Sequence, residues 1–221
     1  MDIIYKTRNF YPDELRILRT LKTRKEKDRN WKIKVYHFFI AGLIGAVSAY
    51  ITSIIPESFW TFLFGTISVI AFSTMLFLPS EIYRIKRERK SFLQQITTFI
   101  NKGTVDTCHI KAQRIAFAPE YEDESDLYIV ELNNEELLYL WDIEYNLKKK
   151  FPCLEFEIYE DDFFILTGKQ IYPLSEKIQP TKIDKKAKWN YFKQYGAPGN
   201  LEIEKGNFDE LLIKYKNSAY I

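Results

Sequence analysis

The chain has 221 residues, enough for one or two domains, and its 32 basic and 30 acidic side chains nearly cancel. That balance hides an uneven distribution: residues 1–34 carry a net charge of +6, residues 35–80 contain one charged side chain, Glu57, and residues 91–221 carry a net charge of −6. A basic start, a nearly uncharged middle and an acidic remainder argue for a membrane protein and against a chain that is soluble throughout.

The first segment, residues 1–34, is predicted to be a basic cytoplasmic juxtamembrane helix. Pro12 and the two acidic residues that follow it are typical of a helix start. The helix has an edge of leucines and is otherwise strongly basic, which suits anionic lipid headgroups. We expect lipid rather than nucleic acid as its partner, because the next segment tethers it to a membrane. No cleavable signal peptide is expected, since an early apolar core is missing.

Residues 35–79 are predicted to form a hairpin of two transmembrane helices. Val35–Ile55 and Phe59–Leu78 are long apolar runs without a charge, and only Pro56-Glu57-Ser58 separates them. A helix of about 20 residues spans about 30 Å, the thickness of a bilayer core. Helices satisfy their own backbone hydrogen bonds, as lipid requires. The alternative is a buried hairpin in a soluble protein.

Basic residues on both outer flanks of the hairpin predict its orientation. The positive-inside rule places both termini in the cytoplasm, and the chain is expected to be an integral membrane protein, of the inner membrane if it is bacterial. Nine side chains are predicted to contact lipid headgroups: Arg24, Lys25, Lys27, Arg29, Lys32, Lys34, Arg84, Lys86 and Arg87.

Small residues recur every four positions in the first apolar run, at Ala41, Gly45 and Ala49. Such a stripe lets two helix backbones approach closely. The partner is either the second helix of the hairpin or another copy of the protein, and the spacing leaves both open.

A separate helix, residues 80–103, is predicted to follow Leu78-Pro79 as a cytoplasmic stalk. Its apolar residues keep helical spacing, and Gly103 is a suitable residue for its end.

Residues 104–175 are predicted to be a small cytoplasmic β domain. Leu127–Leu132 and Leu137–Trp141 flank a four-residue loop, Leu154–Tyr159 alternates between apolar and polar residues, and Phe163–Thr167 is expected to run back as a further strand. These short strands predict a mostly-β antiparallel meander that closes into a barrel or sandwich. Residues 176–221 are expected to be a linker and an α/β tail with a helix capped by Asn207.

An acidic run directly before the predicted strand Leu127–Leu132 is the strongest candidate for a site: Glu120, Glu122, Asp123, Glu124 and Asp126. Carboxylates can bind Ca²⁺ or Mg²⁺, but the spacing does not match an EF-hand, and metal ligands usually come from distant segments. We interpret the run as the solvated entry to a strand, and as an acidic interaction surface that could face the basic juxtamembrane helices.

Other catalytic chemistry is sparse. The two histidines are His37, in an apolar run, and His109, beside Cys108. Cys108 and His109 with the distant Cys153 are too few for a zinc site, which needs about four nitrogen or sulfur ligands. There is no P-loop and no GxGxxG motif. Both cysteines are expected to be reduced in the cytoplasm. We therefore expect no catalytic residues, no bound metal and no cofactor.

The stretch Ala116–Tyr159, with YEDESDLYIVEL, ELLYLW and FPCLEFEIY, resembles a group of uncharacterised bacterial membrane-associated proteins. The resemblance covers about Lys111 to Tyr172 and implies a membrane-tethered β domain without assigned catalytic residues. The chain departs from the group's pattern at residues 133–136, where a glycine is expected in the loop.

Three functions are compatible with this organisation. The first is a non-enzymatic scaffold that holds the β domain at the cytoplasmic face and binds a protein partner or itself. The second is a ligand-sensing membrane effector, whose β domain responds to a nucleotide-like signal and controls oligomerisation of the hairpin. The third, a divalent-metal-dependent enzyme, requires the acidic run to bind metal.

Overall fold

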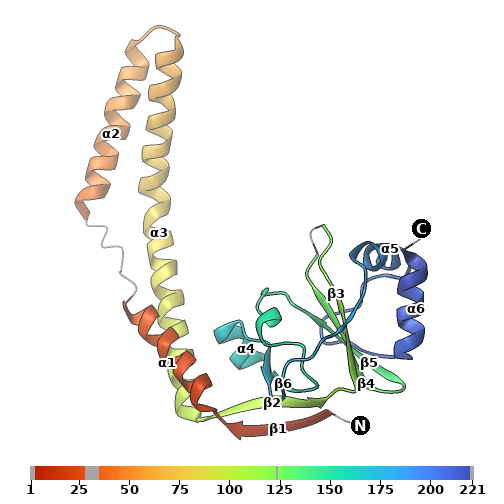
Figure 1. The fold of residues 1–221 in the computed structure, drawn as a ribbon. Helices are drawn as coiled ribbons and strands as arrows, with labels where there is room; N and C mark the ends of the chain where they lie inside the picture. The colour runs from red at the N-terminus through yellow and green to blue at the C-terminus, as the bar shows by residue number, and fades with distance from the viewer. Residues whose placement is uncertain (1–2, 28–34, 123, 220–221) are drawn as a thin grey trace. The chain divides into compact units, whose positions relative to one another are not determined.

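A computed structural model describes residues 3–27, 35–122 and 124–219 (Figure 1). The chain divides into two compact units. Residues 18–98 form the first, called here the helical unit, and residues 1–17 with 99–221 form the second, called the β unit. Two helices, α1 (Pro12–Lys27) and α3 (Phe59–Lys102), begin in one unit and end in the other.

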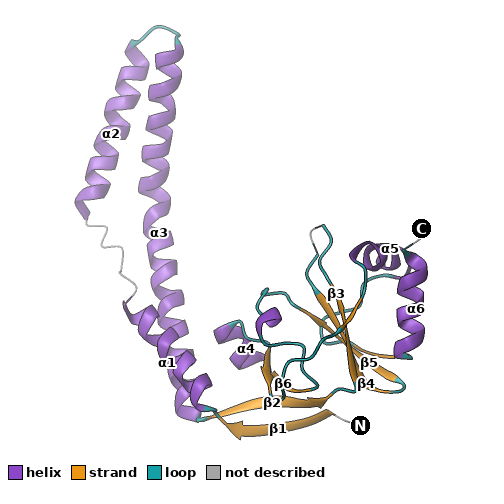
Figure 2. Cartoon of the chain, in the orientation of Figure 1, coloured by secondary structure: helices purple, strands orange, loops and turns teal. Residues whose placement is uncertain are grey.

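The helical unit contains an antiparallel hairpin. Its arms are α2 (Val35–Ile54) and the first half of α3, joined by a short connection around Pro56 (Figure 2). The side chain of Ser68 on α3 donates a hydrogen bond of 3.0 Å to the carbonyl oxygen of Gly45 on α2. Two long apolar helices in a hairpin were predicted, and the structure has them.

The predicted break between the hairpin and a separate stalk is wrong, because α3 is one helix of 44 residues that continues through Pro79. Proline lacks an N–H group, so one hydrogen bond of the helix is lost there. The hydroxyl of the next residue, Ser80, donates to the carbonyl oxygen of Phe77 at 2.7 Å. A single lost bond is tolerated because strong helix formers lie on both sides.

Two sheets make up the framework of the β unit. The first sheet has the order β1-β2-β6-β7 and is antiparallel throughout, whereas the second has the order β8-β3-β4-β5-β9 with one parallel pair, β3 and β8. The strands of the first sheet are β1 (Ile3–Asn9), β2 (Thr104–Lys111), β6 (Glu155–Tyr159) and β7 (Ile171–Pro173). Those of the second are β8 (Thr181–Lys182), β3 (Arg114–Ala118), β4 (Leu127–Asn133), β5 (Glu136–Trp141) and β9 (Ile203–Lys205).

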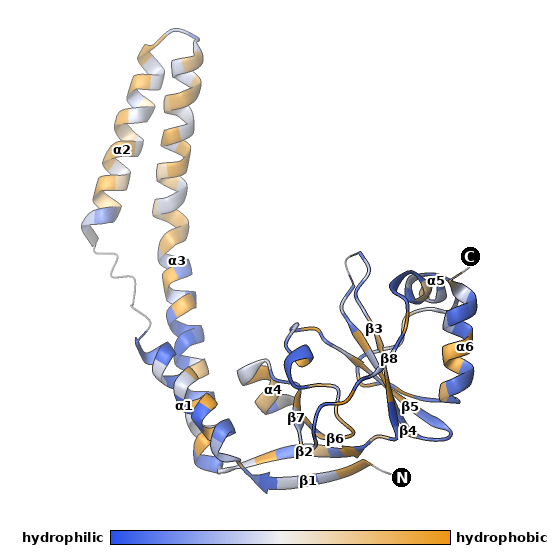
Figure 3. Cartoon of the chain, in the orientation of Figure 1, coloured by the Kyte–Doolittle hydropathy of each residue, from blue (hydrophilic) through white to orange (hydrophobic). Residues whose placement is uncertain are grey.

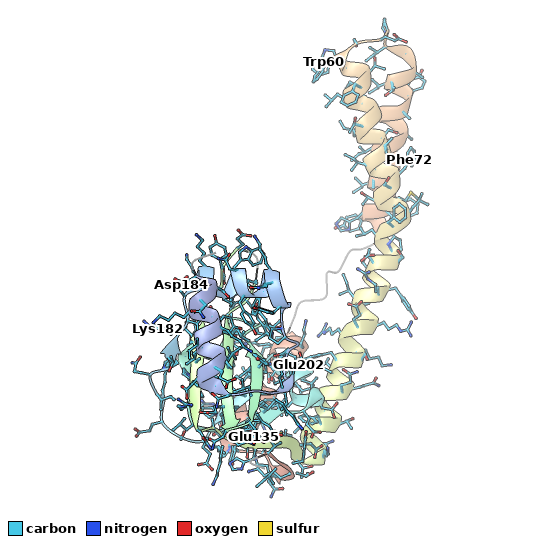
Figure 4. All side chains as sticks on the ribbon, turned by 90° about the vertical axis from the view of Figure 1, so that its right-hand side faces the viewer. Trp60, Phe72, Glu135, Lys182, Asp184 and Glu202 are labelled. Atoms are coloured by element: carbon cyan, nitrogen blue, oxygen red, sulfur yellow. The ribbon has the colours of Figure 1, made fainter. Side chains whose placement is uncertain are left out.

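The second sheet is buried on both faces, so the β unit has three layers (Figure 1). Along β4, Tyr128 and Val130 join a core shared with the first sheet, whereas Leu127 and Ile129 join a core under α5 (Lys185–Tyr195) and α6 (Phe208–Ser218). This alternation explains why the early strands are apolar on both faces. The side chain of Asp184, labelled in Figure 4, caps α5 by accepting from two backbone N–H groups.

Two features of the β unit differ from the sequence-based predictions. Residues 3–9 form a strand that completes the first sheet, although residues 1–34 were assigned to a juxtamembrane helix beginning near Pro12 and no strand was predicted there. The predicted tail, residues 176–221, belongs to the same compact unit as residues 104–175 because its helices cover a sheet face.

The predicted strand Phe163–Thr167 is also wrong: Asp161–Thr167 form the short helix α4. A five-residue apolar run does not distinguish helix from strand by its period. The helix ends at Gly168, whose φ of 67° is easily adopted only by glycine. Phe163 is fully buried and stacks on Tyr159 with ring centroids 4.1 Å apart, while Ile165 points outward. A 3-10 turn, η1 (Leu147–Lys149), precedes β6.

Candidate functional site: an apolar hairpin and a cleft in the β unit

The hairpin turns its large apolar side chains outward. Only 11% of the apolar window of α2 and 6% of that of α3 is buried. Phe39, Phe62 and Leu76 are each 74% exposed, and Figure 3 shows apolar residues along both arms. Trp60, at the start of α3, and Phe72, farther along it, are labelled in Figure 4. Both helices are long and apolar enough to cross a membrane.

The predicted small-residue stripe is only partly at the interface between the two arms. Gly45 is buried, and a Cβ atom built on it would lie 3.3 Å from Ala71 and from the ring of Phe72. Ala41 is half-buried, but Ala49 is exposed and Ser48 is buried in its place. Within one chain, the close approach therefore follows Gly45 and Ser48 rather than a strict four-residue repeat.

Replacing Gly45 with leucine is expected to loosen the hairpin. The new side chain has no space against Ala71 and Phe72, and overpacking of this kind costs about 1–3 kcal/mol. Thermal unfolding of the full chain in detergent micelles measures the effect. The matched control is Ala49→Leu, which introduces the same side chain at an exposed position of the same helix. An equal loss of stability in both variants would contradict this interface.

Basic residues gather where the apolar part of α3 ends. Arg84, Lys86 and Arg87 are exposed on α3, and with Lys25 of α1 they line a groove of about 970 Å³. The groove also has apolar walls, among them Leu78 and Phe92. Arg84 forms a 2.7 Å ion pair with Glu81. Of the remaining predicted headgroup contacts, Arg24 and Lys27 are exposed in the last turn of α1, and Arg29, Lys32 and Lys34 lie outside the described residues.

The acidic run is not a uniformly solvated surface. Asp126 is fully buried, accepts from the backbone N–H of Glu120 at 2.9 Å and pairs with Lys148 Nζ at 2.6 Å. Glu124 is mostly buried and pairs with Lys188 Nζ at 3.1 Å. The expectation that these two carboxylates face outward is therefore wrong, because basic residues of the β unit draw them inward.

The rest of the run is placed differently. Glu120 and Glu122 are exposed, and Glu122 has a φ of 58°, in the left-handed region of a tight turn. Asp123 lies outside the described residues. Lys188 is fully buried, and burial lowers its pKa while Glu124 partly offsets that effect. No local pattern in the sequence indicates Lys148 or Lys188 as partners, because both are far from the run along the chain.

A second group of charges, called here the charge cluster, lies on the face of the first sheet where α1 begins. The guanidinium of Arg8 donates to both oxygens of Glu14, at 2.8 and 2.7 Å, and to Glu157 at 2.7 Å. Lys6 pairs with Glu157 at 2.6 Å, and the hydroxyl of Tyr159 donates to Glu14 at 2.6 Å. The cluster holds β1 and the start of α1 on the β unit.

The pKa directions in the charge cluster follow its hydrogen bonds. Burial alone would raise the pKa of Glu157, but hydrogen bonds from Arg8 and Lys6 outweigh burial and lower it. Burial and the bond to Glu14 raise the pKa of the Tyr159 hydroxyl. Both carboxylates of the cluster are therefore compensated by cations, as buried charges require.

A cleft of about 430 Å³ opens on the other face of the first sheet. Its walls come from β1, β2 and β6, from Leu201 and Ile203 at the edge of the second sheet, and from α4 with the last turns of α3. Most of the lining residues are apolar or aromatic, and Cys108 is among the lining residues. Three carboxylates, Asp106, Glu160 and Asp162, stand at one end, and no lysine or arginine is among the described residues of the lining.

The described residues offer few groups for catalysis. No three histidine, cysteine, aspartate or glutamate side chains lie close enough among them to hold a metal ion. Cys108 and Cys153 are free thiols, the second fully buried, and burial raises the pKa of both. His109 Nε2 lies 2.9 Å from Glu155. This pair has no nucleophile beside it in the described contacts, so it is not a triad.

Comparisons with protein-family models, curated proteins and solved structures find no match to the chain.

Proposed function

We propose that the protein is a membrane-anchored, non-enzymatic scaffold that presents the β unit to a protein partner at the cytoplasmic face. The observation that carries the proposal is the outward apolar surface of the hairpin, whose apolar windows are 11% and 6% buried. A soluble protein would bury such helices in its core. Lipid is the environment in which this surface is stable.

The basic groove supports the same placement. Exposed cations at the end of an apolar span suit the anionic headgroups of a cytoplasmic leaflet. With these residues inside, both ends of the hairpin, and with them the β unit, are placed in the cytoplasm.

Two observations favour a protein partner over an enclosed nucleotide-like ligand. Away from the cleft, the space between the two sheets is filled by buried side chains, including Tyr128, Phe151 and Phe156. The cleft has carboxylates at its rim and no basic residue in its described lining, a poor match for phosphate. The sensing effector therefore has less support than the scaffold.

Alkaline extraction tests the anchoring. Membranes from cells that express the full chain are washed with carbonate and sedimented. We expect the protein in the pellet, because two apolar helices hold it in lipid. Release into the supernatant, as for a peripheral protein, would contradict the proposal.

A further inference from the structure

We propose that the cleft of the β unit binds an extended peptide in which apolar residues alternate and a basic residue stands at one end, and that this peptide adds a strand to the free edge of β1. The inference rests on the proposed function, because it names the class of protein partner that the scaffold would hold.

The edge of β1 is open for such an addition. β1 is the outermost strand of the first sheet, and its seven residues pair only with β2 among the described strands. An unpaired edge of this length presents a row of backbone N–H and C=O groups to an incoming strand. At the edge of the second sheet, β9 has only three residues, so β1 offers the longer template.

The side chains next to this edge form the cleft. Paired residues of neighbouring strands share a face, so Ile3 lies beside Ile110 and Tyr5 beside Cys108. Tyr5 is 73% exposed and Ile203, on the far wall, is 47% exposed. A strand added to β1 would place every second side chain over this surface. Two apolar side chains, opposite Ile3 and Tyr5, would cover it.

The acidic end of the cleft determines where the basic residue belongs. Thr7 pairs with Asp106 in the register of the sheet, and its hydroxyl donates to that carboxylate. The backbone N–H of Glu160 donates to the carbonyl oxygen of Asp106 at 3.1 Å, which places Glu160 at the same end. Lys102 pairs with Asp106 at 2.7 Å, but no described ion pair engages Glu160 or Asp162. A lysine or arginine opposite Thr7 would balance these two carboxylates.

The native thiol of Cys108 allows the occupancy of the cleft to be measured by alkylation. Cys108 is half-buried in the lining, whereas Cys153 is fully buried in the core, so alkylation of the folded chain should occur at Cys108. The rate of its alkylation by iodoacetamide, followed by mass spectrometry on the full chain in lipid nanodiscs, reports occupancy of the cleft.

The probes are two acetylated, amidated peptides, Lys-Thr-Val-Thr-Val-Thr and its reverse, which cover antiparallel and parallel addition. We expect one of them to slow alkylation of Cys108 in a saturable way. A peptide with glutamate in place of lysine, and one with N-methylated backbone amides, should not protect. The proposal would be overturned if either control peptide protected Cys108 as well as the probe does, or if neither probe protected it. Equal protection by n-butylamine would also overturn it.

Neutralising the rim with Glu160→Gln and Asp162→Asn should weaken binding of the protective peptide roughly two- to tenfold, since exposed ion pairs are individually weak. The matched control, Glu176→Gln with Glu210→Gln, removes two exposed charges elsewhere and should leave binding unchanged. The alkylation rate of each variant with peptide is compared with the rate of the same variant without peptide. This is necessary because burial and the charge of Glu160 raise the pKa of the Cys108 thiol. Unchanged binding by the rim variant would overturn the role of the carboxylates.

Carbonate extraction of the same chains separates a failure of peptide binding from a failure of membrane anchoring.

Discussion

Placing an aspartate on the outward face of each hairpin helix, Ile44→Asp together with Val69→Asp, is expected to abolish retention of the chain in carbonate-washed membranes. The side chains of Ile44 and Val69 are 47% and 66% exposed, near the middle of the two apolar runs. A carboxylate at the centre of a membrane helix costs about 2.5–3.5 kcal/mol, so the pair costs about 5–7 kcal/mol. The measurement is the fraction of protein that remains in the pellet.

The control for this prediction is Ile165→Asp. Ile165 is 71% exposed on α4 of the β unit, so the same substitution there adds a charge without entering lipid. The control should stay in the pellet like the unmodified chain. Full retention of the double variant would mean that the apolar surface of the hairpin is not in the bilayer, and would contradict the proposed anchoring.

Removing the central cation of the charge cluster with Arg8→Met is expected to destabilise the β unit by about 3–5 kcal/mol, because two buried carboxylates lose their shared partner. Arg8 binds Glu14 and Glu157 and has a side chain that is 13% exposed. Denaturant unfolding of the full chain in micelles, followed by tryptophan fluorescence, measures the change. Lys182→Met is the control, since Lys182 is exposed on β8 (Figure 4) and should matter by less than about 0.5 kcal/mol.

The effect of Arg8→Met should also depend on pH. The pKa of Glu157 in the folded chain lies below its ordinary value of 4.5, so its stabilising contribution is complete above pH 4.5 and is lost as the pH falls through the folded-state pKa. The difference in unfolding free energy between the unmodified chain and Arg8→Met should therefore shrink in acid. A difference that stays constant from pH 7 to pH 3 would show that the charge of Glu157 does not contribute through Arg8.

The hairpin and the central strands could be predicted because their signals are local. The length and apolar composition of the runs 35–55 and 59–78 can be read from consecutive residues. Strands β4 and β5 are apolar runs on either side of a polar loop. Strand β1 could not be predicted, because Ile3–Asn9 contains mixed residues and becomes a strand only by pairing with β2, about 100 residues away. Tertiary pairing of this kind overrides local propensity.

The acidic run illustrates the same limit at the level of a site. Five carboxylates in seven residues look solvated when read alone, and Glu120 and Glu122 are exposed. Asp126 and Glu124 are not, because the fold brings Lys148 and Lys188 to them. The charge cluster and the cleft also join the first strand to β2 and β6. No spacing rule within the sequence links these segments.

The measurement that tests the central claim most directly is the accessibility, from outside intact cells, of the hairpin connection and of the β unit. In a background with Cys108→Ser and Cys153→Ala, single cysteines are introduced at the hairpin connection with Glu57→Cys and at the exposed start of α5 with Lys186→Cys. A membrane-impermeant maleimide should label the Glu57→Cys chain in intact cells or spheroplasts, and the Lys186→Cys chain only after lysis. Labelling of both before lysis, or of neither, would contradict a hairpin that crosses the membrane with the β unit in the cytoplasm.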